Sequence, residues 1–424
     1  MATLLDLETL TNKAPFFLST IQLFKNRIKS QEFCRNFFLL PKSIYMKTTF
    51  IEMTKTGFVV TCFLFVVAGC KKNPFPKPDQ LNANYEQVNL VGDNDQYNPM
   101  RVDPDLRNAW GQAFAPSGPD WVNAQATGLS FIFNTQGGDV RPPVAIPSPT
   151  SDMGGGHPTG IVFNGSSGFR LPNGNPARFI FVGDDGVISG WNGGNVAIRV
   201  KDHSSSASYT GLAIAADGAD SFIYAANFLS GHIEVYDTAW GDVSGKPFAD
   251  PSLPQDYAPF NIQNVDGNLF VMYAKVSGEP GEEETGAGLG FVDVYHPNGK
   301  LIKRFVSGGK LNAPWGVAMA PTAFWANQKW DDAEDNGKMM EKQHHDAKTV
   351  ILVGNFGDGH INAYDQDGDF MGPLRSKGKP IEIEGLWSLS FAPATATMID
   401  PNWLFFAAGP GDEQHGLFGY IKRN

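Results

Sequence analysis

Cysteine, charged residues and long hydrophobic runs are all scarce in this sequence of 424 residues. Three cysteines are too few for a disulfide-rich scaffold or for a four-cysteine zinc site. The main hydrophobic run, residues 57–68, is twelve residues long, whereas a helix needs about 20 apolar residues to span a membrane. The sequence also lacks a nucleophile elbow, a phosphate-binding loop and a dinucleotide-binding fingerprint. The sequence therefore has no motif that would indicate an α/β-hydrolase, a P-loop nucleotide hydrolase or a dinucleotide-dependent enzyme.

The hydrophobic run at 57–68 has the length of the hydrophobic core of a secretory signal. Lys55 precedes the run, and the tetrapeptide Val-Ala-Gly-Cys at 67–70 ends it. This tetrapeptide resembles the lipobox of bacterial lipoproteins, in which small residues let a peptidase reach the backbone and the cysteine thiol takes a diacylglycerol. We therefore expect Cys70 to be the lipidation site. The alternatives are an ordinary secretory signal with a chance cysteine, and a buried helix.

The expected signal divides the chain into four segments. A signal peptide begins near its basic residues, so translation is expected to start at Met46 or Met53. The predicted segments are a wrongly assigned upstream extension (1–45), a lipoprotein signal peptide (46–69), a flexible Pro-rich tether (70–84) and a six-bladed β-propeller (85–424).

The net charge of the chain argues against nucleic acids and anionic surfaces as partners. Of the 33 Lys+Arg and 44 Asp+Glu residues, 25 and 40 remain when residues 1–69 are removed, a net charge of −15. Nucleic acids and anionic surfaces attract basic proteins, so neither is an expected partner.

We expect a lipid-anchored protein of the bacterial cell envelope, periplasmic or surface-exposed, that meets the membrane through its anchor. Its folded body would hold no cysteine, and therefore no disulfide or cysteine nucleophile.

A short pattern with a small residue at its centre recurs six times along the chain. The two most similar copies are NAWGQAFAP at 108–116 and APWGVAMAP at 313–321. The small positions are 111, 160, 211, 261, 316 and 388, so successive repeats are 49, 51, 50, 55 and 72 residues apart. Self-similarity near 50 residues, carried by short strands between Gly, Pro and Asn turns, is typical of a β-propeller. Small and large residues alternate here, so one face of each strand would let the neighbouring blade approach.

Each repeat is expected to form one four-stranded antiparallel blade, which makes the fold all-β with six blades. β-branched and aromatic residues between Gly, Asn and Asp turns support the strands. In blade three the expected strands are 209–215, 222–227, 231–237 and a short outer strand near 246–248. Blade six runs out of chain after its third strand, at 415–421. The strand at 86–91 is therefore expected to pair with this edge and close the ring.

Four motifs within the repeats are specific enough to indicate a relationship. They are Gly-Asn-Phe-Gly-Asp-Gly at 354–359, Asn-Ile-Gln-Asn at 261–264, Pro-Trp-Gly at 314–316 and Gly-Leu-Trp at 385–387. With these motifs, residues 85–421 resemble an uncharacterised family of exported bacterial propellers. The resemblance implies a six-bladed fold related to the NHL type. It implies no activity and no catalytic residues, because the function of that family is itself unknown.

Strand direction predicts which polar residues gather at one mouth of the central channel. If the first strand of each blade descends, the second rises, so the loop after the second strand lies where the first strand begins. The candidate binding residues at this mouth are His157, Asp184, Asn227, Lys275 and Asn355. The alternative is that the asparagines cap turns with their own side chains and that the charged residues pair with neighbours.

Asn261 and Gln263 are candidate binding residues for a different reason. Blade four has amides at positions where the other blades have Gly, Ala or Val. A buried amide needs hydrogen-bond partners, and a ligand or an ordered water in the channel would supply them.

The sequence favours a binding module for a small ligand or an envelope protein over an enzyme. The alternative is a metal-assisted hydrolase or lyase of the propeller lactonase kind. The side-chain oxygens of Asp184, Asn227 and Asn355 resemble the calcium ligands of such lactonases, although the residues have no spacing signature. Calcium is therefore the candidate cofactor, and no other is indicated.

Overall fold

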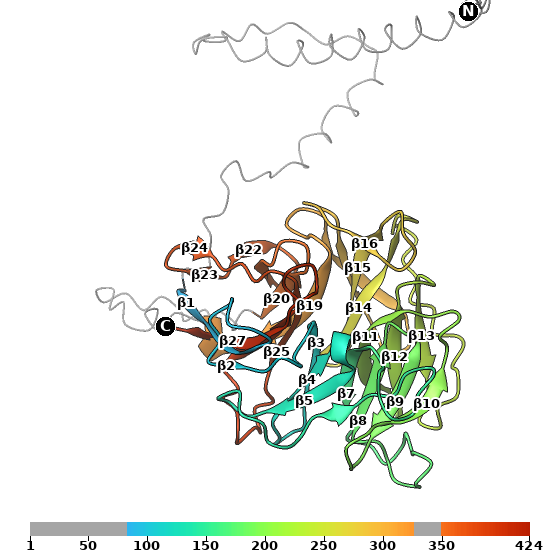
Figure 1. Cartoon of the computed structure of the whole chain (residues 1–424). Helices are drawn as coiled ribbons and strands as arrows, with labels where there is room; N and C mark the ends of the chain where they lie inside the picture. The colour runs from blue at the N-terminus through green and yellow to red at the C-terminus, as the bar shows by residue number, and fades with distance from the viewer. Residues whose placement is uncertain (1–82, 326–348) are drawn as a thin grey trace, which may run out of the picture. The chain divides into compact units, whose positions relative to one another are not determined.

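The computed structural model describes residues 83–325 and 349–424. Figure 1 shows six small sheets that follow one another in chain order around a common axis. The innermost strands of neighbouring sheets contact one another in a closed ring. The predicted all-β, six-bladed propeller is therefore confirmed. The expected upstream extension (1–45), signal (46–69) and Cys70, and most of the tether (70–84), lie outside the described residues.

Blades one to three are antiparallel sheets whose strands run outward from the axis in chain order. Blade one contains β3 (Ala109–Phe114), β4 (Asp120–Ala124), β5 (Leu129–Phe133) and β6 (Val144–Ala145), with the short 3-10 helix η1 (Gln125–Thr127) between β4 and β5. Blade two contains β7 (Pro158–Phe163), β8 (Phe179–Gly183), β9 (Val187–Trp191) and β10 (Ile198–Asp202). Blade three contains β11 (Tyr209–Asp217), β12 (Asp220–Asn227) and β13 (His232–Tyr236).

Blades four to six follow the same plan with small additions. Blade four contains β14 (Tyr257–Val265), β15 (Asn268–Val276), β17 (Phe291–Tyr295) and β18 (Leu301–Ser307), and β16 (Glu283–Glu284) pairs with β15. Blade five contains β19 (Pro314–Ala320), β20 (Val350–Asn355), β21 (Ile361–Asp365) and β22 (Phe370–Pro373). The helix α2 (Thr322–Trp325) follows β19, and the hairpin β23 (Arg375–Ser376) and β24 (Lys379–Pro380) follows β22. No helix among the described residues is long and apolar enough to cross a membrane.

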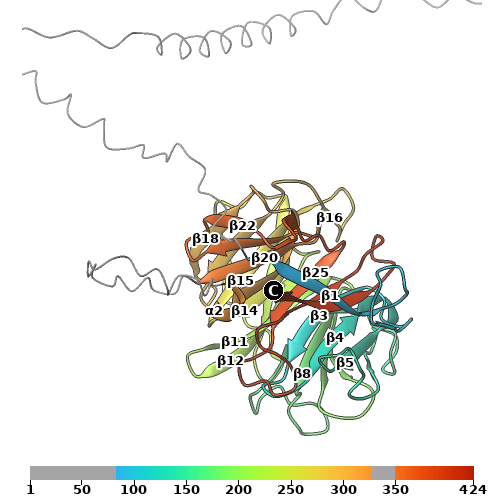
Figure 2. The ribbon, with the colours of Figure 1, turned by 90° about the vertical axis from the view of Figure 1, so that its left-hand side faces the viewer.

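Blade six is completed by the start of the folded body. Its strands β25 (Leu386–Phe391), β26 (Leu404–Ala408) and β27 (Leu417–Arg423) are joined by β1 (Tyr85–Gly92), with β2 (Arg101–Val102) beyond it. The pairing of β1 with β27 is antiparallel, from Tyr85 opposite Arg423 to Gly92 opposite Leu417, and Figure 2 shows β1 beside the chain's C-terminus. The predicted closure of the ring by the N-terminal strand is therefore confirmed.

The small positions of the repeat are required by the close approach of the inner strands. An added Cβ on Gly111 would lie 2.1 Å from the carbonyl oxygen of Thr159 in the next blade. One on Gly211 would lie 2.1 Å from Oδ1 of Asn261. Neither distance is possible for a real side chain, so glycine is what lets these strands meet around the axis.

The hydrophobic core consists of six clusters, each shared by two neighbouring blades, and a seventh on the axis. In the cluster between blades two and three, for example, Ile180 and Val182 pack with Leu212 and Ile223. Each sheet therefore buries both faces, one against each neighbour, which matches the near-continuous apolar strands of the sequence.

Blade three differs from its prediction at its outer edge. The expected strand near 246–248 does not form, because Pro247 has no N–H to donate to a ladder. Phe248 N instead donates to the carbonyl oxygen of Gly299 in blade four. Blade three therefore has three strands, and its outer segment fastens it to the next blade.

Candidate functional site

An aromatic cluster occupies the axis at one end of the ring. We call this end the start face, because the first strand of each blade begins there, and the opposite end the finish face. The axial aromatic cluster comprises Trp110, Phe228, Phe260, Trp315, Phe356 and Trp387. Trp387 is 1% exposed, and its ring stacks on Trp110 at 3.6 Å and on Phe356 at 4.1 Å between centroids. Side chains from five blades therefore pack together on the axis at the end where the sequence predicts a mouth surrounded by polar residues.

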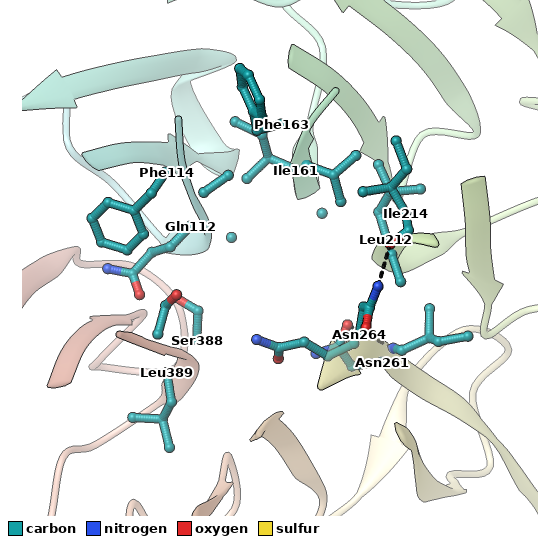
Figure 3. A pocket seen from close by; sticks show the side chains of 18 of the residues that line it. Gln112, Phe114, Ile161, Phe163, Leu212, Ile214, Asn261, Asn264, Ser388 and Leu389 are labelled. Carbon is teal, nitrogen blue, oxygen red and sulfur yellow. Dashed lines mark hydrogen bonds between the residues drawn. The ribbon is translucent and has the colours of Figure 1, made fainter. Parts of the chain in front are cut away.

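The channel beyond this cluster forms a pocket of about 380 Å³, which we call the axial pocket. Its wall is made of the inner strands from the small positions to the strand ends, so it opens at the finish face. Figure 3 shows its side chains arranged around the central hollow. The residues that line it are Gly111, Gln112, Ala113, Phe114, Pro116, Gly160, Ile161, Val162, Phe163, Leu212, Ala213, Ile214, Asn261, Ile262, Gln263, Asn264, Trp315, Ser388, Leu389, Ser390 and Pro393.

The wall of the axial pocket has an apolar and a polar side, and none of the residues that line it is charged. Blades two and three contribute Ile161, Phe163, Leu212 and Ile214, which Figure 3 shows on one side of the hollow. Blades one, four and six contribute the amides and hydroxyls. A pocket of this size and lining is typical of small-molecule sites, which fall between about 300 and 1,000 Å³.

Some polar side chains of the axial pocket are already paired. Asn261, which is 2% exposed, donates from Nδ2 to the carbonyl oxygen of Trp315 at 2.8 Å, and its Oδ1 accepts from Ile262 N at 2.8 Å. Oε1 of Gln263 accepts a long hydrogen bond of 3.4 Å from Val317 N. Asn261 thus satisfies its amide within the protein, as the cost of burying unpaired amides requires.

Two buried side-chain atoms of the axial pocket have no hydrogen-bond partner among the described residues. They are Oε1 of Gln112 and Oγ of Ser388, and both atoms are buried. A buried acceptor or hydroxyl without a partner costs about 1–3 kcal/mol. These atoms therefore mark a place where a bound group would gain most.

At the start face, two of the predicted mouth residues belong to a hydrogen-bond network. Asp184 accepts from Nε2 of Gln125 at 2.6 Å, and Nδ1 of His157 lies 3.3 Å from its other carboxylate oxygen. This hydrogen bond to Asp184 is the main cause that raises the pKa of His157. Oε1 of Gln125 accepts in turn from Asn108. The network links blades one and two across the start face.

Asn108 connects this network to blade six and to the axial aromatic cluster. Its Nδ2 also donates to Oε2 of Glu413 at 2.7 Å, and its Oδ1 accepts from Nε1 of Trp387 at 2.9 Å. Asn108 is 1% exposed, so its three hydrogen bonds replace those that water would supply. Blade one is thereby held to the last blade at the point where the ring closes.

The other predicted mouth residues stabilise turns or pair locally. Asn227 donates from Nδ2 to Glu234 at 2.8 Å, and its Oδ1 accepts from two backbone amides. Asn355 donates to the carbonyl oxygen of Lys310 at 2.8 Å and to Asp358 at 3.0 Å. These contacts agree with the turn-capping alternative.

Lys275 pairs with Glu284 at 2.6 Å on the hairpin of blade four. The seven candidate residues therefore do not share one site. Asn261 and Gln263 line the axial pocket, whereas the other five belong to the start face. Whether any of them binds a ligand stays a prediction.

Sequence reasoning missed the axial aromatic cluster, although the signal is present. Trp110, Phe260, Trp315 and Trp387 each directly precede the small position of their repeat. Neighbouring residues of a strand face opposite sides, but the backbone irregularities at this point of the inner strands, for example between Ala109 and Gln112, change the register. Side chains before the small position therefore converge on the axis at the start face.

The calcium site stays a prediction. Among the residues described, no group of three or more His, Cys, Asp or Glu side chains is placed to hold a metal ion. Asp184, Asn227 and Asn355, the expected ligands, bond instead to different partners.

Comparison with known proteins finds relatives but no activity. The chain is 29% identical to the uncharacterised protein R648 of Acanthamoeba polyphaga mimivirus over 353 residues, 80% of each chain. It is 28% identical to the uncharacterised protein L690 of the same virus over 371 residues, 83% of this chain and 89% of L690. No family model matches. These relatives are viral, so the resemblance to exported bacterial propellers stays a prediction.

Solved structures show a general likeness. A streptogramin B lyase has a TM-score of 0.44 at 12% identity and covers 82% of this chain and 100% of its own. The WD40 domain of Neurospora crassa Pan2 has a TM-score of 0.42 at 14% identity and covers 81% of this chain and 97% of its own. At these values no activity can be transferred. What the six sheets themselves show is that the chain is a six-bladed β-propeller.

Proposed function

We propose that this protein is a ligand-binding propeller that holds a neutral small molecule in the axial pocket and does not transform it. The observation that supports this most is the pocket of about 380 Å³, which no charged side chain lines and in which buried polar atoms of Gln112 and Ser388 lack partners. The lining also contains no nucleophile–base pair of the kind that covalent catalysis needs.

The chemistry of the wall indicates the ligand class. A charged group entering a pocket without a counter-charge loses its hydration and gains no ion pair. A purely apolar ligand would leave Oε1 of Gln112 and Oγ of Ser388 unpaired. The ligand that fits is neutral, with one apolar side toward Ile161 and Leu212 and one side that forms hydrogen bonds. The same class includes an uncharged side chain of an envelope protein that inserts into the pocket.

We also propose that the propeller is tethered to the bacterial cell envelope through a lipid on Cys70. This rests on the signal-like run at 57–68 and on the tetrapeptide at 67–70. In bacterial cells that express the whole chain, labelled fatty acid should enter the wild-type protein but not the Cys70→Ser variant. Equal labelling of both would refute the anchor. Proteinase treatment of intact cells would then show whether the propeller is surface-exposed or periplasmic.

Fluorine NMR with two probes of equal size tests the pocket. 4-Fluorobenzamide is neutral, whereas 4-fluorobenzoate has a carboxylate in place of the amide. We expect the amide to bind the wild-type protein at least about tenfold more tightly than the carboxylate, since the pocket offers the charge no partner.

A variant that fills the pocket locates the binding. Ile214→Trp places a larger ring into the hollow and should abolish binding of the amide, whereas Leu229→Trp, at a leucine that is 44% exposed, should not. Equal affinity for the two probes, or binding that survives Ile214→Trp, would contradict the proposed function.

A further inference from the structure

One corner of the axial pocket is formed by Gln112 and Ser388, and we call it the Gln112–Ser388 corner. Gln112 belongs to β3 of blade one and Ser388 to β25 of blade six, two strands that contact each other where the ring closes. Figure 3 shows the two side chains next to each other on the same side of the hollow. The corner therefore combines residues from the two ends of the propeller repeat.

Each residue of the corner has a buried polar atom without a partner. Ser388 is 4% exposed, and its Oγ has no hydrogen bond among the described residues. Oε1 of Gln112 is in the same condition. Ser390, two residues along the same strand, differs because its hydroxyl donates to the carbonyl oxygen of Phe391. The lack of partners is thus a property of the corner and not of every polar residue in the pocket.

The orientation of the Gln112 amide follows from its hydrogen bond to Asp120. Nε2 of Gln112 donates to Oδ2 of Asp120 at 3.2 Å. The two residues share a face of the β3–β4 pair, because Gln112 lies opposite Val122 and Phe114 lies opposite Asp120. Turning the amide over would bring its oxygen against the carboxylate, so that two acceptors would face each other. The amide oxygen consequently stays on the side of the pocket.

Asp120 is suited to this role because it is completely buried. Its exposed fraction is 0%, and the burial raises the pKa of its carboxyl well above the usual range. A carboxyl group has an oxygen that accepts from Nε2 of Gln112 whether or not the other oxygen carries a proton. The ionised carboxylate excludes the turned orientation because it has no proton to donate to the amide oxygen, and the structure has Nε2 donating to Oδ2.

We propose that the Gln112–Ser388 corner is a donor-selecting subsite: it binds an N–H or O–H group of the neutral ligand through Oε1 of Gln112 and Oγ of Ser388, with Asp120 as the positioning residue. This inference rests on the proposed function, since it names the group that the axial pocket selects. Amides and alcohols belong to the selected class, whereas ketones and esters of the same shape do not. A molecule without a donor leaves the buried amide oxygen unpaired and loses affinity for that reason.

The test compares 4-fluorobenzamide with 4-fluoroacetophenone, which keeps the carbonyl oxygen and replaces the amide NH₂ by a methyl group of similar size. The dissociation constants of both probes are measured by fluorine NMR on the purified protein. We expect wild type to bind the amide about tenfold more tightly than the ketone, the effect of one hydrogen bond to a buried acceptor.

Variants then assign the preference to residues. Gln112→Met should bind both probes with similar affinity, and Ser388→Ala should reduce the preference. Ser390→Ala is the matched control and should retain it. Asp120→Leu should lower the preference while the ketone affinity stays unchanged, and Asp120→Asn, which keeps an acceptor for Nε2, should restore it.

The outcomes separate this inference from the proposed function. Binding of both probes that Ile214→Trp leaves intact would overturn the proposed function itself. Binding in the pocket with equal affinities, or a preference that survives Gln112→Met, would overturn the subsite alone. If Asp120→Leu does not fold, or weakens both probes equally, Asp120 is a structural residue and its positioning role is refuted.

Discussion

Glu413 should make the protein less stable as the pH rises through neutrality. Its carboxylate accepts from Asn108 on the start face. Burial is the largest cause that raises its pKa from 4.5 to about 7, and three neighbouring carboxylates add to it, those of Glu282, Asp184 and Asp412. The hydrogen bond from Asn108 acts in the opposite direction but is outweighed.

The sign of the effect follows from proton binding. Because the pKa of Glu413 is higher in the folded than in the unfolded chain, the folded protein retains a proton that the unfolded protein releases. The resulting stabilisation is complete below pH 4.5 and is lost as the pH rises through about 7. Each pH unit between the two values is worth about 1.4 kcal/mol, which sets an upper value of about 3 kcal/mol. Glu413 is only partly buried, so screening by water and salt should leave about 1–2 kcal/mol.

Glu413→Gln is the perturbation that tests this. Glutamine keeps an oxygen that accepts from Asn108 but cannot ionise. In urea unfolding, the variant should match wild type near pH 4.5 and exceed it by about 1–2 kcal/mol at pH 8. Glu279→Gln makes the same chemical change at an exposed residue of the neighbouring loop and is the control. If Glu413→Gln gains no more free energy of unfolding at pH 8 than Glu279→Gln does, ionisation of Glu413 does not destabilise the folded protein and the reasoning is refuted.

Three further predictions concern the fold. Deleting 85–92 removes the closing strand with three buried side chains, each worth about 1.5–3 kcal/mol, and should lower the melting temperature sharply, whereas deleting 71–80 should not; equal melting would disprove the closure. Trp387→Ala should cost about 3–5 kcal/mol in urea unfolding, and a loss below about 1 kcal/mol would show that the axial aromatic cluster does not hold the blades. Gly211→Ala should cost about 1–3 kcal/mol, since its Cβ would lie 2.1 Å from a side-chain oxygen of blade four. Gly278→Ala, with nothing within 4 Å of its Cβ, should be close to neutral, and similar losses for the two glycines would refute the close approach.

The architecture of this protein could be predicted from local pattern. The repeat near 50 residues, the alternation within each inner strand and the unpaired last blade are properties of the chain order itself. They led to six blades and to the closing strand at 86–91, because each strand needs a partner and the chain supplies them in sequence. Even the small position of the repeat, at Gly111 and Gly211, had its physical reason in the pattern.

The site was decided by the tertiary structure. The sequence assigned Asp184 to a mouth of the channel and Asn261 to the channel itself, but it did not show that the axial aromatic cluster lies between them. That cluster forms because a change of register within the inner strands turns Trp387 and its counterparts toward the axis, and such irregularities leave no mark in the periodicity of the sequence.

The hydrogen-bond partners of individual polar atoms could not be predicted from the sequence either. The sequence predicts Asn261 as a candidate binding residue. In the structure its amide donates to the carbonyl oxygen of Trp315, which lies 54 residues further along the chain. Gln112 was not among the residues predicted from the sequence. In the structure its Nε2 donates to Asp120, and its Oε1 is buried without a partner among the described residues. Residue type determines what an atom can bond, but only the packing of distant blades determines which atoms are left for a ligand.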